Sequence, residues 1–316
     1  MELAMIGLGR MGGNMAHRLT DAGHTVVGWT RSGDESLEKQ YGISWAGTLE
    51  NAVAALEQRP RVVWLMIPAG APTSATVTQL TGLLEAGDIV VDGGNSNFRD
   101  SQQHAATLAE HGIEFIDCGT SGGVWGYANG YCLMMGGSDA AVAALAPAFE
   151  TLAPPDGWLH TGPVGSGHFT KMVHNGIEYG LMQAYGEGFE ILEKSEFDLD
   201  LPATAEVWRH SSVIQSWLLD LLARALAEDP KLEHIKGYVD DSGEGRWTVM
   251  EAINEGVAAP AIAIALMARF TSRDPDPFAM KAIAALREQF GGHAVLPETA
   301  PGEAAPPVAP SDPAAT

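Results

Sequence analysis

A polar stripe stands out in "KMVHNGIEYG", residues 171–180, where helical spacing would normally place apolar side chains. The positions i, i+3, i+4 and i+7, which line one side of a helix, are taken by Lys171, His174, Asn175 and Glu178. At 1.5 Å per residue, the amine and the carboxylate at the two ends lie about 10 Å apart along the axis. They could therefore act as base and acid on different carbons of one ligand, with His174 and Asn175 as hydrogen-bond donors between them.

The alternative for this stripe is a solvated helix face that happens to carry a lysine and a glutamate. Gly176 argues against it, because glycine in an exposed helix costs about 1 kcal/mol relative to alanine and indicates close approach of backbone or ligand. To act as a base Lys171 must be neutral, so partial burial or neighbouring cations should lower its pKa. The residues of this helix that we expect to pack inward are Met172, Val173, Ile177 and Leu181.

A second motif, "GLGRMG", has the spacing of a dinucleotide-binding turn. Gly7 permits the tight turn, Gly9 lets a pyrophosphate approach the backbone, and Gly12 lets helix and strand pack closely. The turn follows an apolar strand and opens a helix, whose N-terminus would face the phosphates. The cofactor-binding residues expected from this motif and from nearby strand ends are Gly7, Gly9, Arg10, Met11, Gly12, Pro68 and Asn95.

The end of the second strand, in "GWTRSGD", bears on the choice of nicotinamide cofactor. An NAD site places an Asp or Glu there for the ribose 2′-hydroxyl, whereas this chain has Thr30, Arg31 and Ser32. A guanidinium and two hydroxyls without a carboxylate suit a 2′-phosphate, which favours NADP over NAD. In the alternative, Arg31 is solvated in an ordinary polar turn and Asp34 serves the ribose. A phosphorylated deazaflavin cofactor is also compatible with this pocket.

These residues need elements that bring them together, and the first half of the chain alternates apolar runs with helical patterns. The runs are "LAMIG", "TVVGW", "RVVWLMI", "DIVVDGG" and "IEFIDCG". Strands that recur with helices between them predict a mostly parallel sheet, and helical periodicity takes over from Gly165 onward. The predicted fold is an α/β Rossmann-type doubly wound N-terminal domain, 1–162, followed by an all-α C-terminal domain, 163–292. A Pro- and Ala-rich tail, 293–316, is predicted to be disordered.

Composition argues against several functional classes. The chain has 316 residues and a net charge of −22, which opposes binding to nucleic acid or an anionic membrane. Any anionic ligand must therefore be held by a few placed cations. No apolar run reaches the roughly 18 residues that span a bilayer, and we expect "GVAAPAIAIALMA", 256–268, to be a buried helix.

The N-terminus and the cysteines bear on location and metal binding. The first residues lack a basic leader, so we expect a cytoplasmic protein. Cys118 and Cys132 have neither metal-site nor redox-motif spacing. We therefore expect no metal and two reduced, structural cysteines.

Further segments, in order along the chain, carry a resemblance to a known family. They are "DGGNSNFRDS" (92–101), "GTSGGVWGYANGYCLMMGG" (119–137), "GHFTKMVHNGIEYGLMQAYGEGFEIL" (167–192) and "DSGEGRWT" (241–248). Over residues 1–293 the sequence resembles the short-chain branch of the decarboxylating 6-phosphogluconate dehydrogenases, within the β-hydroxyacid dehydrogenase superfamily. The run His-Asn-Gly-Ile-Glu-Tyr is highly specific, because related β-hydroxyacid dehydrogenases share the glycine turn, the Ser-Gly-Gly and the lysine but not this run.

The resemblance implies an activity and an assembly. The expected reaction oxidises the 3-hydroxyl of 6-phosphogluconate by hydride transfer and then releases CO2 to give ribulose 5-phosphate. It further implies that Lys171 is the general base that takes the hydroxyl proton and then polarises the ketone, and that Glu178 is the acid that protonates the enediol. The expected assembly is a dimer or tetramer, held through the helical domain.

Two strand ends supply further candidate substrate contacts. Ser121, Gly122 and Gly123 form a small-residue turn whose backbone N–H groups could bind the substrate carboxylate; a simple tight turn is the alternative. Asn95 lies at the carboxyl end of a strand, where open sheets bind ligands. By resemblance it lies near both nicotinamide and substrate, whereas the alternative is a turn capped by the Asn95 side chain.

For the substrate phosphate, the resemblance points to a set of residues late in the chain: Tyr179, Arg269, Arg287 and His293. In the family the last segment reaches into the partner's site. This chain departs from the long-chain members, which carry a lysine and a threonine just before the Trp-Thr pair, because Ser242 and Glu244 stand in that region. Only Arg246 is basic there, and a structural ion pair is the alternative role for it.

Two rival functions remain open at the level of sequence. A β-hydroxyacid dehydrogenase acting on a small unphosphorylated acid would share the glycine turn, the Ser-Gly-Gly and the lysine, but would not need the late cations. A catalytically silent dinucleotide sensor would keep only the fold. Neither rival requires the run that follows Lys171.

Overall fold

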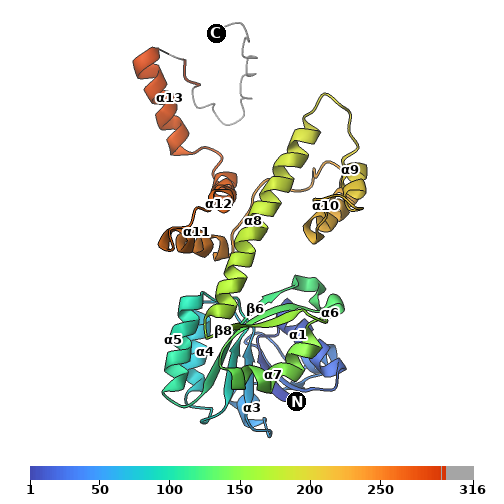
Figure 1. Ribbon diagram of the computed structural model, residues 1–316, viewed down its shortest axis with the longest axis vertical. Helices are drawn as coiled ribbons and strands as arrows, with labels where there is room; N and C mark the ends of the chain where they lie inside the picture. Colours follow the sequence, from blue (N-terminus) through green and yellow to red (C-terminus); the bar gives the residue numbers. More distant parts are fainter. Residues whose placement is uncertain (293, 297–316) are drawn as a thin grey trace. The chain divides into compact units, whose positions relative to one another are not determined.

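The computed structural model describes residues 1–292 and 294–296 (Figure 1), so His293 and most of the predicted tail lie outside the described residues. Contacts divide the chain into two compact units. The first comprises Met1–Lys236 and Asp241–Leu266, and the second comprises Gly237–Asp240 and the residues from Met267 onward. The last strand ends at Gly162 and a long helix begins at Ser166, but the predicted division into domains at 162/163 stays a prediction.

Within the described residues, eight strands form one sheet in the order β3-β2-β1-β4-β5-β6-β7-β8. Neighbouring strands are parallel except for the antiparallel pair β6 and β7. The predicted mostly parallel, doubly wound sheet is confirmed, although the sequence runs did not reveal β3, β7 or β8. The strands are β1 Glu2–Ile6, β2 Thr25–Trp29, β3 Ser44–Trp45, β4 Val62–Leu65, β5 Ile89–Asp92, β6 Glu114–Ser121, β7 Cys132–Gly136 and β8 Trp158–Gly162.

Helices cover both faces of the sheet. Successive residues of a strand point to opposite faces, so one strand contributes side chains to two cores. In β1, Leu3 and Met5 pack into one core with helices α1 and α7, whereas Ala4 and Ile6 pack into a second core with α3, α4 and α5. The helices of this part are α1 Arg10–Asp21, α2 Ser36–Tyr41, α3 Leu49–Ala54, α4 Ala71–Leu80, α5 Phe98–Ala109, α6 Gly126–Asn129 and α7 Asp139–Leu152, with a 3₁₀ turn η1 at Gly123–Trp125.

Helix α8, Ser166–Glu193, begins directly on the sheet and carries the polar stripe. Its N-terminus is fixed by Asp117 of β6, a fully buried carboxylate that accepts hydrogen bonds from the N–H groups of Gly165 (2.7 Å) and His168 (2.8 Å). Gly119, two residues along β6, leaves room for the helix, because a Cβ there would collide with the side chain of Lys171. The strand thereby sets the height of the lysine above the sheet.

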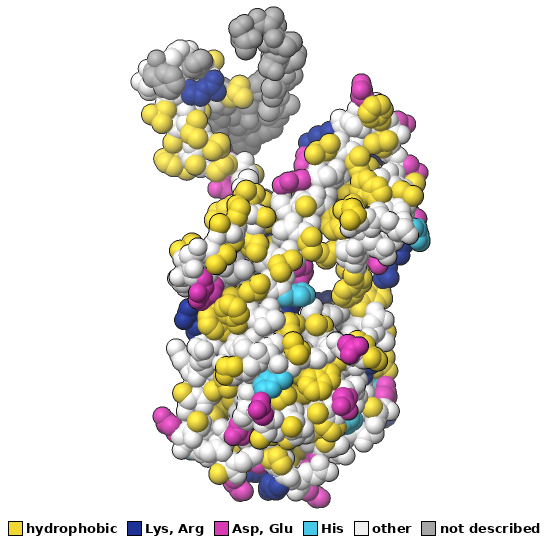
Figure 2. Space-filling view, viewed as in Figure 1, with side chains coloured by type: hydrophobic (Ala, Val, Ile, Leu, Met, Phe, Trp, Pro, Cys, Tyr) yellow, Lys and Arg dark blue, Asp and Glu magenta, His cyan; other side chains and the backbone are white. Residues whose placement is uncertain are grey.

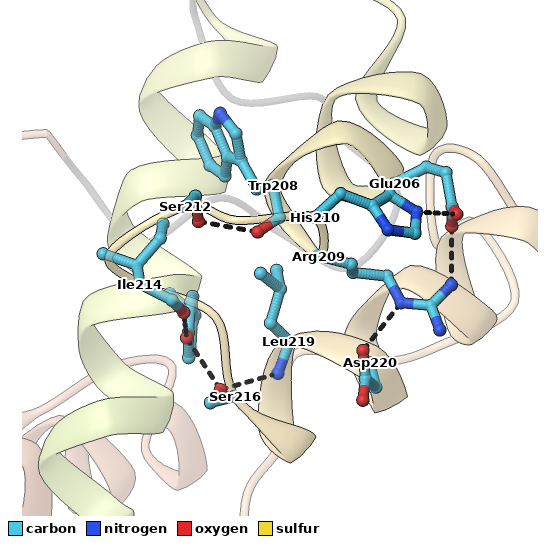
Figure 3. A network of polar contacts seen from close by, with 10 residues as sticks. Glu206, Trp208, Arg209, His210, Ser212, Ile214, Ser216, Leu219 and Asp220 are labelled. Atoms are coloured by element: carbon cyan, nitrogen blue, oxygen red, sulfur yellow. Dashed lines mark hydrogen bonds and ion pairs between the residues drawn. The ribbon is translucent and has the colours of Figure 1, made fainter.

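Two short helices pack beside the distal half of α8 around a small core of Phe189, Ala205, Leu219, Ala223 and Leu226. They are α9 Leu201–Trp208 and α10 Trp217–Glu228. Figure 3 shows the polar network that joins them: Arg209 donates to Glu206 and to Asp220, which are 2.6 and 2.7 Å away. Tyr185 of α8 donates to the carbonyl of Ile214, which fixes the loop before α10.

The remaining helices are α11 Glu244–Asn254, α12 Pro260–Arg273 and α13 Phe278–Gly291. In the second unit, the segment 237–240 is tied to the end of α12: the Val239 N–H donates to Ser272 Oγ at 3.0 Å, and Arg269 donates to the carbonyl of Asp240 at 2.9 Å. The prediction of a buried helix over 256–268 is largely wrong for this single chain, since Ile264 and Met267 are exposed and only Ala265 and Leu266 are buried.

Helix α13 carries apolar side chains on its surface, which Figure 2 shows as a yellow group on the part of that helix that is described. They belong to Phe278, Met280, Ile283 and Leu286. Among the helices of residues 1–292, none has both the length and the apolar character needed to cross a bilayer.

Candidate active site

The polar stripe of α8 forms a connected group of side chains. Lys171 is only 5% exposed, and its Nζ donates to Asn175 Oδ1 at 2.5 Å. Nδ1 of His174 lies 2.9 Å from the same oxygen and 3.9 Å from Glu178 Oε2. His174 and Glu178 remain partly exposed, so the stripe passes from a buried amine to a solvent-accessible carboxylate.

Burial lowers the pKa of Lys171, as the sequence predicted for a base. The charged neighbours of the lysine are Glu244 and Glu178 rather than cations, and these carboxylates raise its pKa in opposition to burial. Desolvation is therefore the cause of the shift, and the carboxylates limit it. A buried amine in this balance can be neutral when it takes a proton and charged when it polarises a carbonyl.

The wall opposite the stripe is the carboxyl end of β6 with the turn that follows it. Gly122 and Gly123 have positive φ angles of 124° and 54°, which a residue with a Cβ rarely adopts. Asn95 also has a positive φ, 54°; its Nδ2 donates to the carbonyl of Thr120 (3.0 Å), and its Oδ1 accepts from the N–H of Thr120 (2.8 Å). The Asn95 side chain therefore bonds across to β6 instead of capping its own turn, and Asn95 lines the pocket.

Stripe and wall enclose a pocket of about 930 Å³. The predicted residues that line it are Met11, Asn95, Ser121, Gly122, Gly123, Lys171, His174, Asn175 and Glu178. Residues from four distant stretches of sequence thus meet in one cavity. Its size suits a small ligand together with part of a cofactor.

The pocket also has an apolar wall that the sequence did not predict. Ile177 and Leu181, expected to pack inward, line it and are 54% and 46% exposed, so that prediction is wrong for them. Met172, by contrast, is buried. The other apolar lining residues are Val124, Trp125, Phe169, Val173, Trp217, Leu218 and Leu221. Helical periodicity cannot distinguish a face that packs on a core from a face that borders a pocket.

Helix α10 contributes to this apolar wall. Trp217 and Leu221 line the pocket, and the guanidinium of Arg224 stacks over the ring of Trp125 at 4.9 Å. No local sequence signal could have paired residues so far apart in the chain.

The glycine turn between β1 and α1 fits a pyrophosphate. A Cβ on Gly7 would collide with the carbonyl of Met66, and one on Gly12 would collide with the carbonyl of Gly7. A Cβ on Gly9 would meet nothing within 4 Å, so this side of the turn is open to a ligand. Among the described residues, no side chain caps α1 and no acidic residue stands in its first turn, which leaves its N–H groups for an anion.

The end of β2 presents the residues expected near the ribose. Arg31 and Ser32 are exposed and Thr30 is half-buried. Hydrogen bonds from the Ser36 side chain and from the Ser36 N–H, which is 2.9 Å from Asp34 Oδ1, lower the pKa of Asp34 and tie this carboxylate to the start of α2. That role makes Asp34 less available to a ribose, while Arg31 is open to a 2′-phosphate. Pro68 stands after β4, where its carbonyl accepts from Thr73.

The segment before α11 meets α8 at Tyr179. The Tyr179 ring is buried, and its hydroxyl accepts the N–H of Ser242 at 3.1 Å. Arg246 donates to both carboxylate oxygens of Asp241, at 2.8 and 2.9 Å. This bidentate pair is the structural ion pair that was the alternative role for Arg246.

The remaining predicted phosphate ligands are not tested by this site. Arg269 and the exposed Arg287 belong to the second compact unit, and His293 lies outside the described residues. Their assignment stays a prediction. Among the described residues, no group of three or more His, Cys, Asp or Glu side chains is arranged to hold a metal ion.

Glu244 is a site residue that the sequence did not assign. It was noted only as a departure from the long-chain pattern, yet it is 6% exposed and its carboxylate accepts the Nδ2 of Asn175. Cys132, expected to be structural, is exposed rather than buried, whereas Cys118 is buried; both are free thiols.

Comparison with family models matches both parts of the chain. Residues 2–162 match the NAD binding domain of 6-phosphogluconate dehydrogenase, and residues 167–293 match the 6-phosphogluconate dehydrogenase C-terminal domain. The Bacillus subtilis protein YqeC is 44% identical over 296 residues, which cover 93% of this chain and 99% of that one. The NAD(+)-dependent decarboxylating 6-phosphogluconate dehydrogenase of Haloferax volcanii is 43% identical, covering 93% and 98%.

Solved structures agree with these matches. Plasmodium falciparum 6-phosphogluconate dehydrogenase, solved in apo form and in complexes with NADP+ and with 6-phosphogluconate, superposes with a TM-score of 0.79 at 28% identity, covering 96% of this chain and 67% of that one. Mycobacterium tuberculosis 3-hydroxyisobutyrate dehydrogenase superposes with a TM-score of 0.69 at 23% identity, over 86% of this chain and 94% of that one, and shows the shared fold alone.

Proposed function

Because the chain belongs to the 6-phosphogluconate dehydrogenase family, we propose that its pocket carries out the oxidative decarboxylation of 6-phosphogluconate to ribulose 5-phosphate and CO2. The observation that carries this proposal is the buried Lys171, bonded to Asn175 at one end of a stripe whose other end is Glu178. A base for oxidation and an acid for the closing protonation are thereby held on one helix.

Lys171 has two successive duties in this reaction. As the neutral amine it takes the proton of the 3-hydroxyl, and as the ammonium it then polarises the new 3-ketone. The β-keto acid loses CO2 readily once that carbonyl is polarised, because the electron pair of the broken C–C bond passes into an enediol. The Asn175 amide, which bonds to the lysine, keeps Nζ directed during both steps.

Glu178 is the acid that completes the reaction by giving a proton to the enediol carbon. Its partial exposure lets it recover a proton from solvent, and His174 beside it can bond to a substrate hydroxyl. The turn Ser121-Gly122-Gly123, on the facing wall, offers backbone N–H groups for the substrate carboxylate.

A nicotinamide cofactor supplies the acceptor for the hydride. The open side of Gly9 and the uncapped start of α1 would hold its pyrophosphate, and Arg31 its 2′-phosphate, which supports NADP as the cofactor. NAD is the alternative, and some relatives are named NAD(+)-dependent. A deazaflavin is a further alternative as the hydride acceptor.

Self-association is the second part of the proposal. Exposed apolar side chains on α12 and α13, Ile264, Met267, Phe278, Ile283 and Leu286, support a dimer or tetramer that covers them. In such an assembly a partner's Arg287 and His293 could supply cations for the phosphate, beside Tyr179 and Arg269. A cytoplasmic location stays a prediction.

The test is an assay of the purified protein with 6-phosphogluconate, gluconate and 3-hydroxyisobutyrate, each with NADP, NAD and a deazaflavin. We expect cofactor reduction and CO2 release with 6-phosphogluconate only. Reduction with 3-hydroxyisobutyrate instead would favour the rival β-hydroxyacid dehydrogenase. Lys171→Ala should abolish turnover while cofactor binding persists; wild-type protein that binds cofactor without turning over any of these acids would instead be the silent sensor.

A further inference from the structure

Helix α11 brings a second buried carboxylate to the reacting end of α8. The two helices pack closely, because Thr248 fills the space above Gly176 and donates its hydroxyl to the carbonyl of Met172 at 2.7 Å. Gly176 thus serves the close approach that the sequence predicted. This packing places Glu244, the first residue of α11, against Asn175.

The contacts of Asn175 define one orientation of its amide. Oδ1 faces Lys171 Nζ and Nδ1 of His174, which are both potential donors, and Nδ2 faces Glu244. A carboxylate can only accept, so it selects the N–H side of the amide and turns the oxygen toward the lysine. The same Glu244 oxygen also accepts from Ser242 Oγ at 3.2 Å, which fixes the carboxylate itself.

We propose that Glu244 is a positioning residue of this active site. Its carboxylate orients the Asn175 amide, and the oriented amide directs Lys171 toward the substrate hydroxyl. The same carboxylate is a negative charge close to the Lys171 amine. The inference rests on the proposed function, in which Lys171 is the base. It gives a role to a carboxylate that stands where the long-chain pattern has none.

The charges around Lys171 and Glu244 determine whether a substitution of Glu244 raises or lowers the pKa of Lys171. The titratable groups that face Lys171 are Glu244 from α11, Glu178 from its own helix and the thiol of Cys132 from β7; those that face Glu244 are Lys171 and Glu178. Burial raises the pKa of Glu244 and lowers that of Lys171, while each group opposes the shift of the other. Removing the Glu244 charge should therefore lower the pKa of Lys171 further.

Two substitutions separate the charge from the hydrogen bond. Glu244→Gln removes the charge but keeps an acceptor for Asn175, whereas Glu244→Leu removes both. We expect Glu244→Gln to move the acid limb of the kcat/KM profile to lower pH by roughly one unit. Glu244→Leu should show the same displacement and also lose roughly ten- to a hundredfold in kcat, because the amide is no longer oriented.

Glu251→Gln is the matched control. Glu251 lies on the same helix, is also buried, and pairs with Arg99 at 2.8 Å instead of with Asn175. Its substitution should leave the acid limb in place. The proposal would be overturned if the acid limb of the kcat/KM profile stayed at its wild-type pH in Glu244→Gln. It would also be overturned if a folded Glu244→Leu variant kept the wild-type kcat. If Glu244→Leu does not fold, the limb of Glu244→Gln alone decides.

A measurement without turnover distinguishes this inference from the proposed function. The side-chain amine of Lys171 can be titrated by NMR in the full chain, with Lys171→Arg identifying its signal among those of Lys39, Lys194, Lys231, Lys236 and Lys281. A lower titration midpoint in Glu244→Gln than in wild type supports the inference even if 6-phosphogluconate is not turned over. An equal midpoint overturns it even if the enzyme is active.

Discussion

Two residues of α8 serve different steps of the proposed reaction, Lys171 the oxidation and Glu178 the closing protonation. Replacing Glu178 tests this assignment most directly. Glu178→Gln cannot donate a proton to the enediol, yet it leaves Lys171 and its contact with Asn175 in place. We expect ribulose 5-phosphate formation to slow by roughly a hundredfold or more, while the hydride-transfer burst remains close to wild type. Stopped-flow absorbance of the reduced cofactor and a product assay measure the two steps separately.

Glu190→Gln provides the control for that experiment. Glu190 lies on the same helix, does not line the active-site pocket, and pairs with Lys194 at the surface. Both steps should keep their wild-type rates in this variant. If Glu178→Gln slowed hydride transfer as much as product formation, Glu178 would not be the closing acid.

The stripe itself could be predicted from sequence because its members lie within one helix and obey one period. The partners of the stripe could not. Glu244 approaches Asn175 from a helix that starts nearly seventy residues later, and Trp217 reaches the pocket from α10. Such pairings depend on how helices pack, and a single sequence contains no periodic signal for that.

Among the elements, α8 depends on the carboxylate of Asp117 beneath its N-terminus. Asp117→Asn would place an amide N–H against one of the two backbone N–H donors, so one of the bonds to Gly165 and His168 would be lost. We expect a loss of about 1–3 kcal/mol in the free energy of unfolding, measured by urea titration, together with a lower kcat because Lys171 follows the helix start.

Asp139→Asn is the comparison for Asp117. Asp139 stands in the first turn of α7 but is fully exposed, so its replacement should change the free energy of unfolding by no more than about 0.5 kcal/mol. Equal losses in the two variants would show that the buried anchor has no special role in holding α8.

The elements differ in how well the sequence revealed them. Five strands were predicted because each is a short apolar run bounded by turn residues. Strand β3 is only two residues long, and β7 and β8 follow glycine- and proline-rich segments that resemble loops. The antiparallel pairing of β6 with β7 is set by the turn after Ser121, whose positive φ angles depend on the folded site.

For the whole molecule, the exposed apolar residues of α13 predict association. Leu286→Glu places a charge among them and should shift the protein toward the monomer in sedimentation velocity runs. Glu288→Ala, seven residues after Lys281 on the charged side of the helix, should leave the distribution unchanged. A wild-type chain that sediments as a monomer at micromolar concentration would refute the proposed assembly.

Strand β6 also limits how this active site could be altered. Asp117, Gly119 and Ser121 lie two residues apart, so all three point to the same face of the sheet: the first fixes the helix, the second admits the lysine, and the third lines the pocket. Inserting or deleting one residue in β6 would turn part of this set to the opposite face. We therefore expect natural or engineered variation in length to be confined to the turn after Ser121, where new side chains could change the ligand without disturbing the base.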